Sequence, residues 1–182
     1  MKIHLVRHGE AAANWQESDD PELSELGHRQ AGDTAAQLLE LVEPDVQLIS
    51  SPLIRAQQTA MPLSERLAKD ITVLEPFREI PTPVAREERQ AWLNSIARKS
   101  WGAQHDMVIT WRTAMLNQLR QIDQSTVVFT HFMVLNAIVS ELTAEDKVVC
   151  FLPDNASVTT IQLKNDKLEL VELGRQLRTI VQ

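Results

Sequence analysis

The sequence predicts an α/β protein built on a largely parallel β-sheet flanked by helices. Short apolar runs typical of buried strands alternate along the chain with segments in which apolar residues recur at helical spacing. This alternation favours parallel strands joined by helical crossovers. The chain has 182 residues, which is enough for one well-buried domain and few for two. Because no repeat or obvious linker interrupts it, we expect a single domain over residues 1–182.

The first expected elements are a strand, a helix and a second strand. The apolar run over 2–6 predicts a short buried strand. Ser24 is a suitable N-cap for a helix whose apolar residues repeat until Pro44 stops them. A second apolar run predicts a strand over 46–49.

The middle of the chain is expected to be mostly helical. A helix is predicted over 53–67, in which Pro62 favours a kink or an early end. A third strand is predicted over 71–74. Thr82 before Pro83 then indicates an N-cap with proline in the first turn of a further helix.

The C-terminal half adds two more helices, a strand and a hairpin. Apolar residues over 108–122 form the cleanest helical stripe in the chain. The run over 126–130 predicts a strand, and the apolar segment over 132–142 predicts a helix directly after it. Residues 157–163 and 168–173 are expected to pair as a β-hairpin.

The composition excludes several classes of protein. A net charge of −7 is unlike that of nucleic-acid-binding proteins, which need a basic face. Cys150 is the single cysteine, so no disulfide can form within the chain. No apolar run approaches the roughly 20 residues that span a membrane, and the N-terminal segment has too few apolar residues for a secretory signal. We therefore expect a cytoplasmic protein that binds neither nucleic acid nor membrane.

Three of the expected strands end in residues that can hold phosphate. These are the segments 7–9 (Arg-His-Gly), 50–55 (Ser-Ser-Pro-Leu-Ile-Arg) and 130–131 (Thr-His). In open α/β sheets the ligand crevice lies outside the carboxyl ends of the strands. We therefore expect two histidines and two arginines to meet at one edge of the sheet.

The residue types in these segments suit phosphoryl transfer. The guanidinium of Arg7 offers a planar fork of N–H donors that matches phosphate oxygens. The imidazole of His8 can attack phosphorus and hold the group covalently. Gly9 would allow a sharp turn and a close approach of the backbone to a ligand. Arg55 is expected in the first turn of a helix, where backbone amides already favour anions.

Six segments together resemble the histidine phosphatase superfamily, which also contains the cofactor-dependent phosphoglycerate mutases. The resemblance runs from residue 3 to about residue 161, in the order and spacing of that family. It implies a three-layer, phosphoglycerate mutase-like fold. The segments are Leu5-Val6-Arg7-His8-Gly9-Glu10 with Asn14, Leu23 to Ala31, Ser50 to Ala60, Phe77-Arg78-Glu79, Phe129-Thr130-His131 and Asn155-Ala156-Ser157.

The resemblance also implies a role for each matching residue. His8 would be the nucleophile, and Glu79 would be the general acid toward the leaving group and then the base for water. The phosphoryl oxygens would be held by Arg7, Asn14, Arg55 and His131. Neither a metal nor a cofactor is expected, because guanidinium and imidazole groups supply the charge neutralisation.

Several positions depart from the family pattern. Ala11 stands where threonine is common, and Phe132 and Met133 replace the two glycines that commonly follow the second histidine. Phe132 is expected to narrow the pocket or make it more apolar. The residues after Glu79 differ from those of the mutase branch, so mutase activity is not expected. Residues 81–107 are the segment expected to select the substrate.

The sequence therefore predicts a metal-independent phosphomonoester phosphatase that acts through a phosphohistidine at His8. One alternative is a phosphatase of phosphohistidine or of another phosphoprotein, for which Glu79 would be dispensable. The other is a non-catalytic module that binds a phosphorylated ligand, a hypothesis motivated by Phe132 and Met133. The expected partner is a small phosphorylated substrate or a phosphoprotein, and the oligomeric state stays open.

Overall fold

The structure, a computed structural model, describes residues 1–13, 18–164 and 167–177. Within these ranges one sheet of six strands has the order β3-β2-β4-β1-β5-β6. The strands are β1 (Lys2–Arg7), β2 (Gln47–Ser50), β3 (Ile71–Val73), β4 (Thr126–Thr130), β5 (Val158–Lys164) and β6 (Lys167–Glu172). The first four strands of that order pair in parallel, whereas β5 pairs antiparallel with β1 and with β6. The expected largely parallel sheet with a C-terminal hairpin is confirmed.

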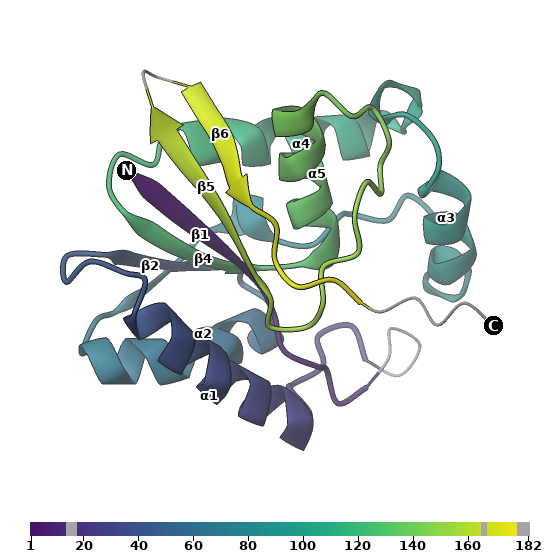
Figure 1. Cartoon of the computed structure of the whole chain (residues 1–182). Helices are drawn as coiled ribbons and strands as arrows, with labels where there is room; N and C mark the ends of the chain where they lie inside the picture. The colour runs from purple at the N-terminus through teal and green to yellow at the C-terminus, as the bar shows by residue number, and fades with distance from the viewer. Residues whose placement is uncertain (14–17, 165–166, 178–182) are drawn as a thin grey trace.

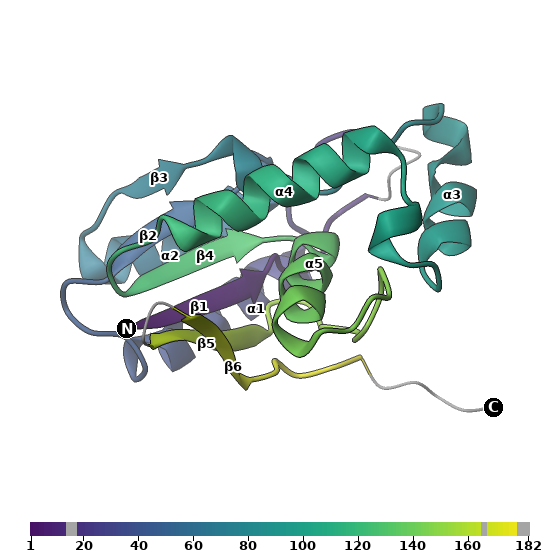
Figure 2. The same cartoon turned by 90° about the horizontal axis from the view of Figure 1, so that it is seen from above.

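Helices cover both faces of this sheet. In Figure 1, α1 and α2 lie below the sheet and α4 and α5 lie above it, which gives three layers. Figure 2 shows α3 apart from the sheet, on the side toward which β1 and β4 run. None of the helices in the described ranges is both long and apolar enough to cross a bilayer. The bounds are α1 (Glu25–Leu39), α2 (Ile54–Leu67), α3 (Arg89–Ile96), α4 (Asp106–Arg120) and α5 (Phe132–Thr143).

The core has two parts because the central strands are buried on both faces. Leu5 of β1 packs in one apolar cluster with Met115 of α4 and Ile138 of α5. Its neighbour Val6 packs on the opposite face, in a second cluster with Leu38 of α1. Successive side chains of a strand point to opposite faces, so a strand between two helical layers needs a continuous apolar run. This requirement explains why the run over 2–6 stood out in the sequence.

The first turn of α1 packs directly against the segment that follows β1. Ser24 caps this helix, accepting a hydrogen bond from the amide of Gly27 at 3.0 Å, as predicted. A Cβ atom at Gly27 would lie 2.1 Å from the carbonyl oxygen of Glu10, and one at Gly9 would lie 2.6 Å from the carbonyl oxygen of Gly27. Neither glycine has a positive φ. Gly9 is therefore needed for contact with α1 rather than for the sharp turn that we expected.

The prediction of a helix capped by Thr82 was wrong. Thr82 does not cap a helix: α3 begins only at Arg89, after a short 3₁₀ turn over Arg86–Glu88. After Thr82 the chain bends at 83–84 and forms the 3₁₀ turn, so no α-helical turn follows the expected cap. At Pro62 we expected a kink or an early end, and the early end is absent, since α2 continues through this residue to Leu67.

Candidate active site

The carboxyl ends of β1, β2 and β4 lie side by side, as the sequence predicted. Arg7 at the end of β1 pairs with Thr130 at the end of β4, and Ser50 of β2 pairs with Phe129 of β4. The residues that follow these strands therefore converge at one edge of the sheet. His8 and His131 meet there, with 5.2 Å between their ring centroids.

The hydrogen bonds of His8 fix its tautomer. Its Nδ1 lies 2.7 Å from the carbonyl oxygen of Gly9, which can only accept, so Nδ1 carries the proton and donates. Its Nε2 accepts a hydrogen bond from Nε of Arg55 at 3.2 Å. Burial, followed by the charges of Arg55 and Arg7, lowers the pKa of His8 to about 3. The imidazole is therefore neutral near pH 7, and its lone pair is on Nε2.

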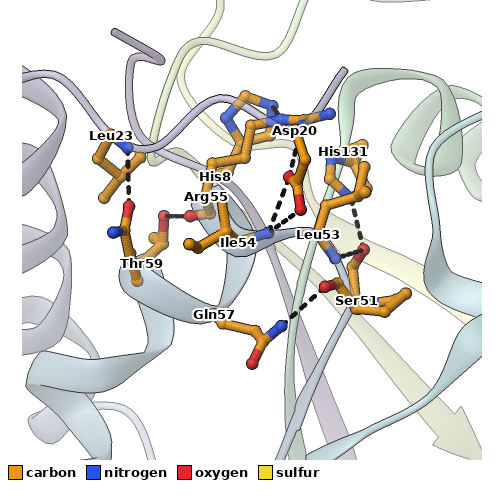
Figure 3. A network of polar contacts seen from close by, with 12 residues as sticks. His8, Asp20, Leu23, Ser51, Leu53, Ile54, Arg55, Gln57, Thr59 and His131 are labelled. Carbon is orange, nitrogen blue, oxygen red and sulfur yellow. Dashed lines mark hydrogen bonds and ion pairs between the residues drawn. The ribbon is translucent and has the colours of Figure 1, made fainter. Parts of the chain in front are cut away.

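Arg55 is a fully buried guanidinium at the start of α2. The carboxylate of Asp20 lies beside it, accepting from the amide of Ile54 at 2.9 Å and approaching Nη1 of Arg55 to 3.4 Å (Figure 3). Asp20 thus binds where the helix N-terminus and Arg55 both favour negative charge. The N-terminus of α2 therefore favours an anion for two reasons: the positive charge of Arg55 and the backbone amide of Ile54.

Thr59 ties the helix that carries Arg55 to the loop that carries His8. Its hydroxyl donates to the carbonyl oxygen of Arg55 at 2.7 Å and accepts from the amide of Gly9 at 3.0 Å. Two sequence motifs that lie 50 residues apart are therefore joined through one side chain.

Arg7 is held from two sides. Its Nη1 donates to the carbonyl oxygen of Pro153 at 2.8 Å, and its guanidinium carbon lies 5.3 Å from the ring centroid of Phe132. Such a cation–π contact is worth about 0.5–2 kcal/mol. Phe132 lines the pocket, as expected, and it also supports Arg7.

His131 is fully buried and bonded to Ser51. Its Nε2 lies 2.6 Å from Oγ of Ser51, and that oxygen accepts from the amide of Leu53 at 3.2 Å (Figure 3). If the serine hydroxyl donates to Nε2, the proton of His131 is on Nδ1. Within the described ranges Nδ1 is buried without a hydrogen-bond partner. Burial, followed by electrostatic coupling to His8 and to Arg55, holds the pKa of His131 well below its usual value, so the ring is neutral.

Glu79 is a buried carboxyl at the N-terminus of α5. Its Oε1 accepts from the amides of Ile80 at 2.9 Å and Met133 at 3.2 Å. Burial raises its pKa, although the amide of Ile80 and the charges of Arg55, Arg89 and Arg7 act in the opposite direction. A carboxyl with a raised pKa keeps its proton to a higher pH than an exposed glutamic acid does, which suits a general acid. Although Met133 replaces glycine, its backbone amide binds Glu79.

These groups open onto one cavity of about 490 Å³. Arg7, His8, Arg55 and Glu79 all line it, whereas His131 is not among the described lining residues. Its apolar wall includes Phe132, Met133, Leu93, Ala97, Val149 and Leu152. Leu93 belongs to α3, which lies in the segment expected to select the substrate. In the part of the chain that the structure describes, no cluster of three His, Cys, Asp or Glu side chains is arranged to hold a metal ion.

A sequence model of the histidine phosphatase superfamily (branch 1) matches residues 3–176. The chain belongs to this superfamily. The predicted resemblance is thus confirmed, and the prediction of a phosphatase is confirmed at the level of the family. A comparison with curated protein sequences gives no match.

Solved structures of phosphatases share the fold of this histidine phosphatase. A mycobacterial glucosyl-3-phosphoglycerate phosphatase in complex with VO3 has a TM-score of 0.70 at 22% identity, over 96% of this chain and 99% of that chain. Phosphoserine phosphatase from Entamoeba histolytica, in complex with 3-phosphoglyceric acid, has a TM-score of 0.76 at 21% identity, over 96% and 97%. A putative alpha-ribazole-5'-P phosphatase from Escherichia coli has a TM-score of 0.73 at 19% identity, over 96% and 97%. These likenesses confirm the expected three-layer fold.

The structure brings together five of the six predicted site residues of this histidine phosphatase, and the sixth, Asn14, lies outside the described residues. Sequence reasoning missed the contacts of Ser51, Asp20 and Arg89. Ser51 was part of a recognised segment, but its partner His131 follows a different strand. Nothing in the sequence distinguishes Arg89 as a site residue, because a lone arginine in a polar segment is ordinarily solvent-exposed.

Proposed function

We propose that this histidine phosphatase hydrolyses phosphomonoesters through a phosphohistidine at His8, without a metal ion and within a single domain. The observation that carries the proposal is the state of His8. The carbonyl of Gly9 holds the proton on Nδ1, and burial keeps the ring neutral, so Nε2 presents a lone pair beside Arg55. Binding of phosphate alone would not need a neutral imidazole with a fixed tautomer.

In the first step, Nε2 of His8 attacks phosphorus and the bond from phosphorus to the leaving oxygen breaks. The carboxyl of Glu79 gives its proton to that oxygen, so the alcohol leaves neutral. Arg7 and Arg55 donate to the other phosphoryl oxygens and stabilise the charge that they carry in the transition state. We propose His131 as a further donor, because its ring centroid lies 5.2 Å from that of His8. When Nε2 attacks, its hydrogen bond from Nε of Arg55 breaks. The N–H group of Arg55 can then donate to the phosphoryl group.

In the second step, the Glu79 carboxylate takes a proton from water as the water oxygen attacks phosphorus. The P–N bond breaks and its electron pair returns to Nε2 of His8. Phosphate leaves, and both residues regain the protonation states with which the cycle began.

The test is hydrolysis of an aryl phosphate in excess EDTA, across about pH 5 to 8, by the wild type and by His8→Ala. We expect wild-type turnover that EDTA does not change, and loss of turnover by about 10³-fold or more in the variant. His28→Ala, at an exposed position on α1, is the matched control and should keep full activity. Turnover that survives in His8→Ala would refute the proposal.

A binding module without catalysis is the competing function, and one observation favours it. Phe132 and Met133 replace two small residues next to His131 and line the cavity, which reduces the room for a substrate. A binding module would bind phosphate with equal strength in the wild type and in Glu79→Gln and would hydrolyse nothing. A protein with measurable turnover that depends on His8 excludes it.

A further inference from the structure

The cavity contains a third arginine, which belongs to the substrate-selecting segment. Arg89 is the first residue of α3, and it lines the same cavity as His8 and Glu79. Its Nη2 donates to the carbonyl oxygen of Ile80, the residue after Glu79, at 3.3 Å. Gln90, Leu93 and Asn94 of the same helix line the cavity as well. One face of α3 therefore lines the cavity.

Arg89 is on the leaving-group side of this cavity. Its guanidinium donates to the carbonyl oxygen of Ile80, the neighbour of the general acid Glu79, and its charge acts on both Glu79 and Arg55. An in-line displacement places the leaving group on the far side of phosphorus from His8, toward the residue that protonates it. Because it lies beside the residue that protonates the leaving oxygen, Arg89 is placed to meet the part of the substrate beyond that oxygen.

Apart from Arg89 and the catalytic groups, the described lining of the cavity is uncharged and largely apolar. Leu93, Phe132, Val149 and Leu152 contribute side chains to it, and none of them can neutralise an ion. A guanidinium that is partly withdrawn from water binds a carboxylate or phosphate oxygen more strongly than it binds a neutral group. In a cavity with apolar walls, the guanidinium of Arg89 would therefore favour anionic ligands over neutral ligands of the same shape.

We propose that the natural substrate is a phosphomonoester whose organic part carries a second anionic group, and that Arg89 binds this group. The proposal rests on the proposed phosphatase function and adds the substrate class. A carboxylate and a second phosphate are both suitable anions, since each presents two oxygens to the guanidinium fork. The rest of the organic part packs against the apolar wall.

The experiment compares two aryl esters that differ in charge and hardly in size: 4-carboxyphenyl phosphate and 4-carbamoylphenyl phosphate. The corresponding 3-substituted pair places the carboxylate or amide at a different position on the ring. The compound 1,4-phenylene bisphosphate has a phosphate in place of the carboxylate. The measured quantity is the ratio of kcat/KM for the anionic ester to that for the carbamoyl ester. We expect a ratio of about 10 to 100 for at least one pair, typical of a charge-assisted contact.

Arg89→Gln should lower this ratio to near one, because it removes the charge and keeps a polar side chain of similar length. Arg98→Gln is the matched control, since Arg98 is exposed just after the same helix and does not line the cavity. It should leave the ratio unchanged. Because Arg89 also acts on Glu79, both esters are slowed together, and only the ratio reports recognition.

A binding measurement separates this inference from the proposed function. Calorimetry with His8→Ala, with and without Arg89→Gln, measures recognition of the same esters without turnover. Tighter binding of the anionic ester that Arg89→Gln abolishes supports the inference even if the wild type hydrolyses neither ester, an outcome that would overturn the proposed function alone. Equal affinity for the two esters, an Arg89-independent preference or binding of neither ester overturns the inference.

Discussion

The protonation of Glu79 controls the departure of the leaving group. We expect Glu79→Gln to lower kcat/KM for alkyl phosphates by about 10² to 10⁴-fold, the usual contribution of a general acid. The loss for p-nitrophenyl phosphate should be far smaller, because p-nitrophenolate leaves without a proton. Kinetics with a series of esters of increasing leaving-group basicity measures this difference. An equal loss across the series would show that Glu79 is not the acid.

The same residue predicts a pH dependence. Burial raises the pKa of Glu79, so the carboxyl keeps its proton at a higher pH than an exposed glutamic acid does. As pH rises through this raised pKa, Glu79 loses its proton, and kcat/KM for alkyl phosphates should fall. The profile of Glu79→Gln should lack this fall. A wild-type profile that rises over the same range would contradict the assignment.

Single residues differ in how well the sequence predicts them. Arg7, His8, Arg55 and His131 could be predicted because each follows an apolar strand, and parallel strands end at a common edge. The tautomers of the two histidines could not, since they depend on which carbonyl or hydroxyl comes within about 3 Å of each ring nitrogen. Those contacts exist only in the folded chain.

At the scale of the element, α1 sets the position of the loop that carries His8. We expect Gly27→Ala to lower the free energy of unfolding by about 3 kcal/mol, because the new methyl group would collide with the backbone of Glu10. Gly32→Ala is the matched control on the same helix: no heavy atom lies within 4 Å of its Cβ position. Alanine there should stabilise the helix by up to about 1 kcal/mol.

Urea unfolding of the two variants measures both values. Activity under conditions where each variant is folded adds a second readout. Gly27→Ala should reduce turnover through the displaced loop, whereas Gly32→Ala should not. Equal stability of the two variants would show that α1 and the loop after β1 are not in the close contact that the structure describes.

The strands were predictable where the burial of apolar side chains dominates. Apolar runs identified the strands, since two layers of helices must bury both of their faces. The start of α3 was not predictable from its cap signal, because the chain after Thr82 bends and forms a 3₁₀ turn before the helix begins. The sequence indicated that 81–107 selects the substrate, but only the fold shows that α3 turns Arg89 and Leu93 into the cavity.

At the scale of the whole molecule, two neutral buried histidines make stability depend on pH. Burial lowers the pKa of His8 to about 3 and holds that of His131 well below its usual value. Between the unfolded-state pKa of about 6.5 and these lower values, the unfolded chain binds protons that the folded protein does not. The free energy of unfolding therefore falls as pH falls, by about 1.4 kcal/mol per pH unit for each histidine. Glu79 acts in the opposite direction because its pKa is raised.

Comparison of variants isolates the contribution of His8. His8→Asn should reduce the slope of unfolding free energy against pH by about 1.4 kcal/mol per unit below about pH 6, because one proton uptake is removed. Urea unfolding at several pH values between about 4.5 and 7 measures both slopes. A slope that His8→Asn leaves unchanged would mean that the folded protein protonates His8 as readily as the unfolded chain does.

In the proposed mechanism His8 carries the phosphoryl group, and this covalent intermediate can be detected chemically. A phosphomonoester with a good leaving group is mixed with the wild type in EDTA, and the reaction is quenched in alkali, in which phosphohistidine survives. Mass spectrometry of the peptides then locates the phosphate. We predict a phosphoryl group on His8 that forms within one turnover, disappears as substrate is exhausted and is absent from His8→Ala. Turnover without a phosphorylated enzyme, or with phosphate on another residue, would contradict the account.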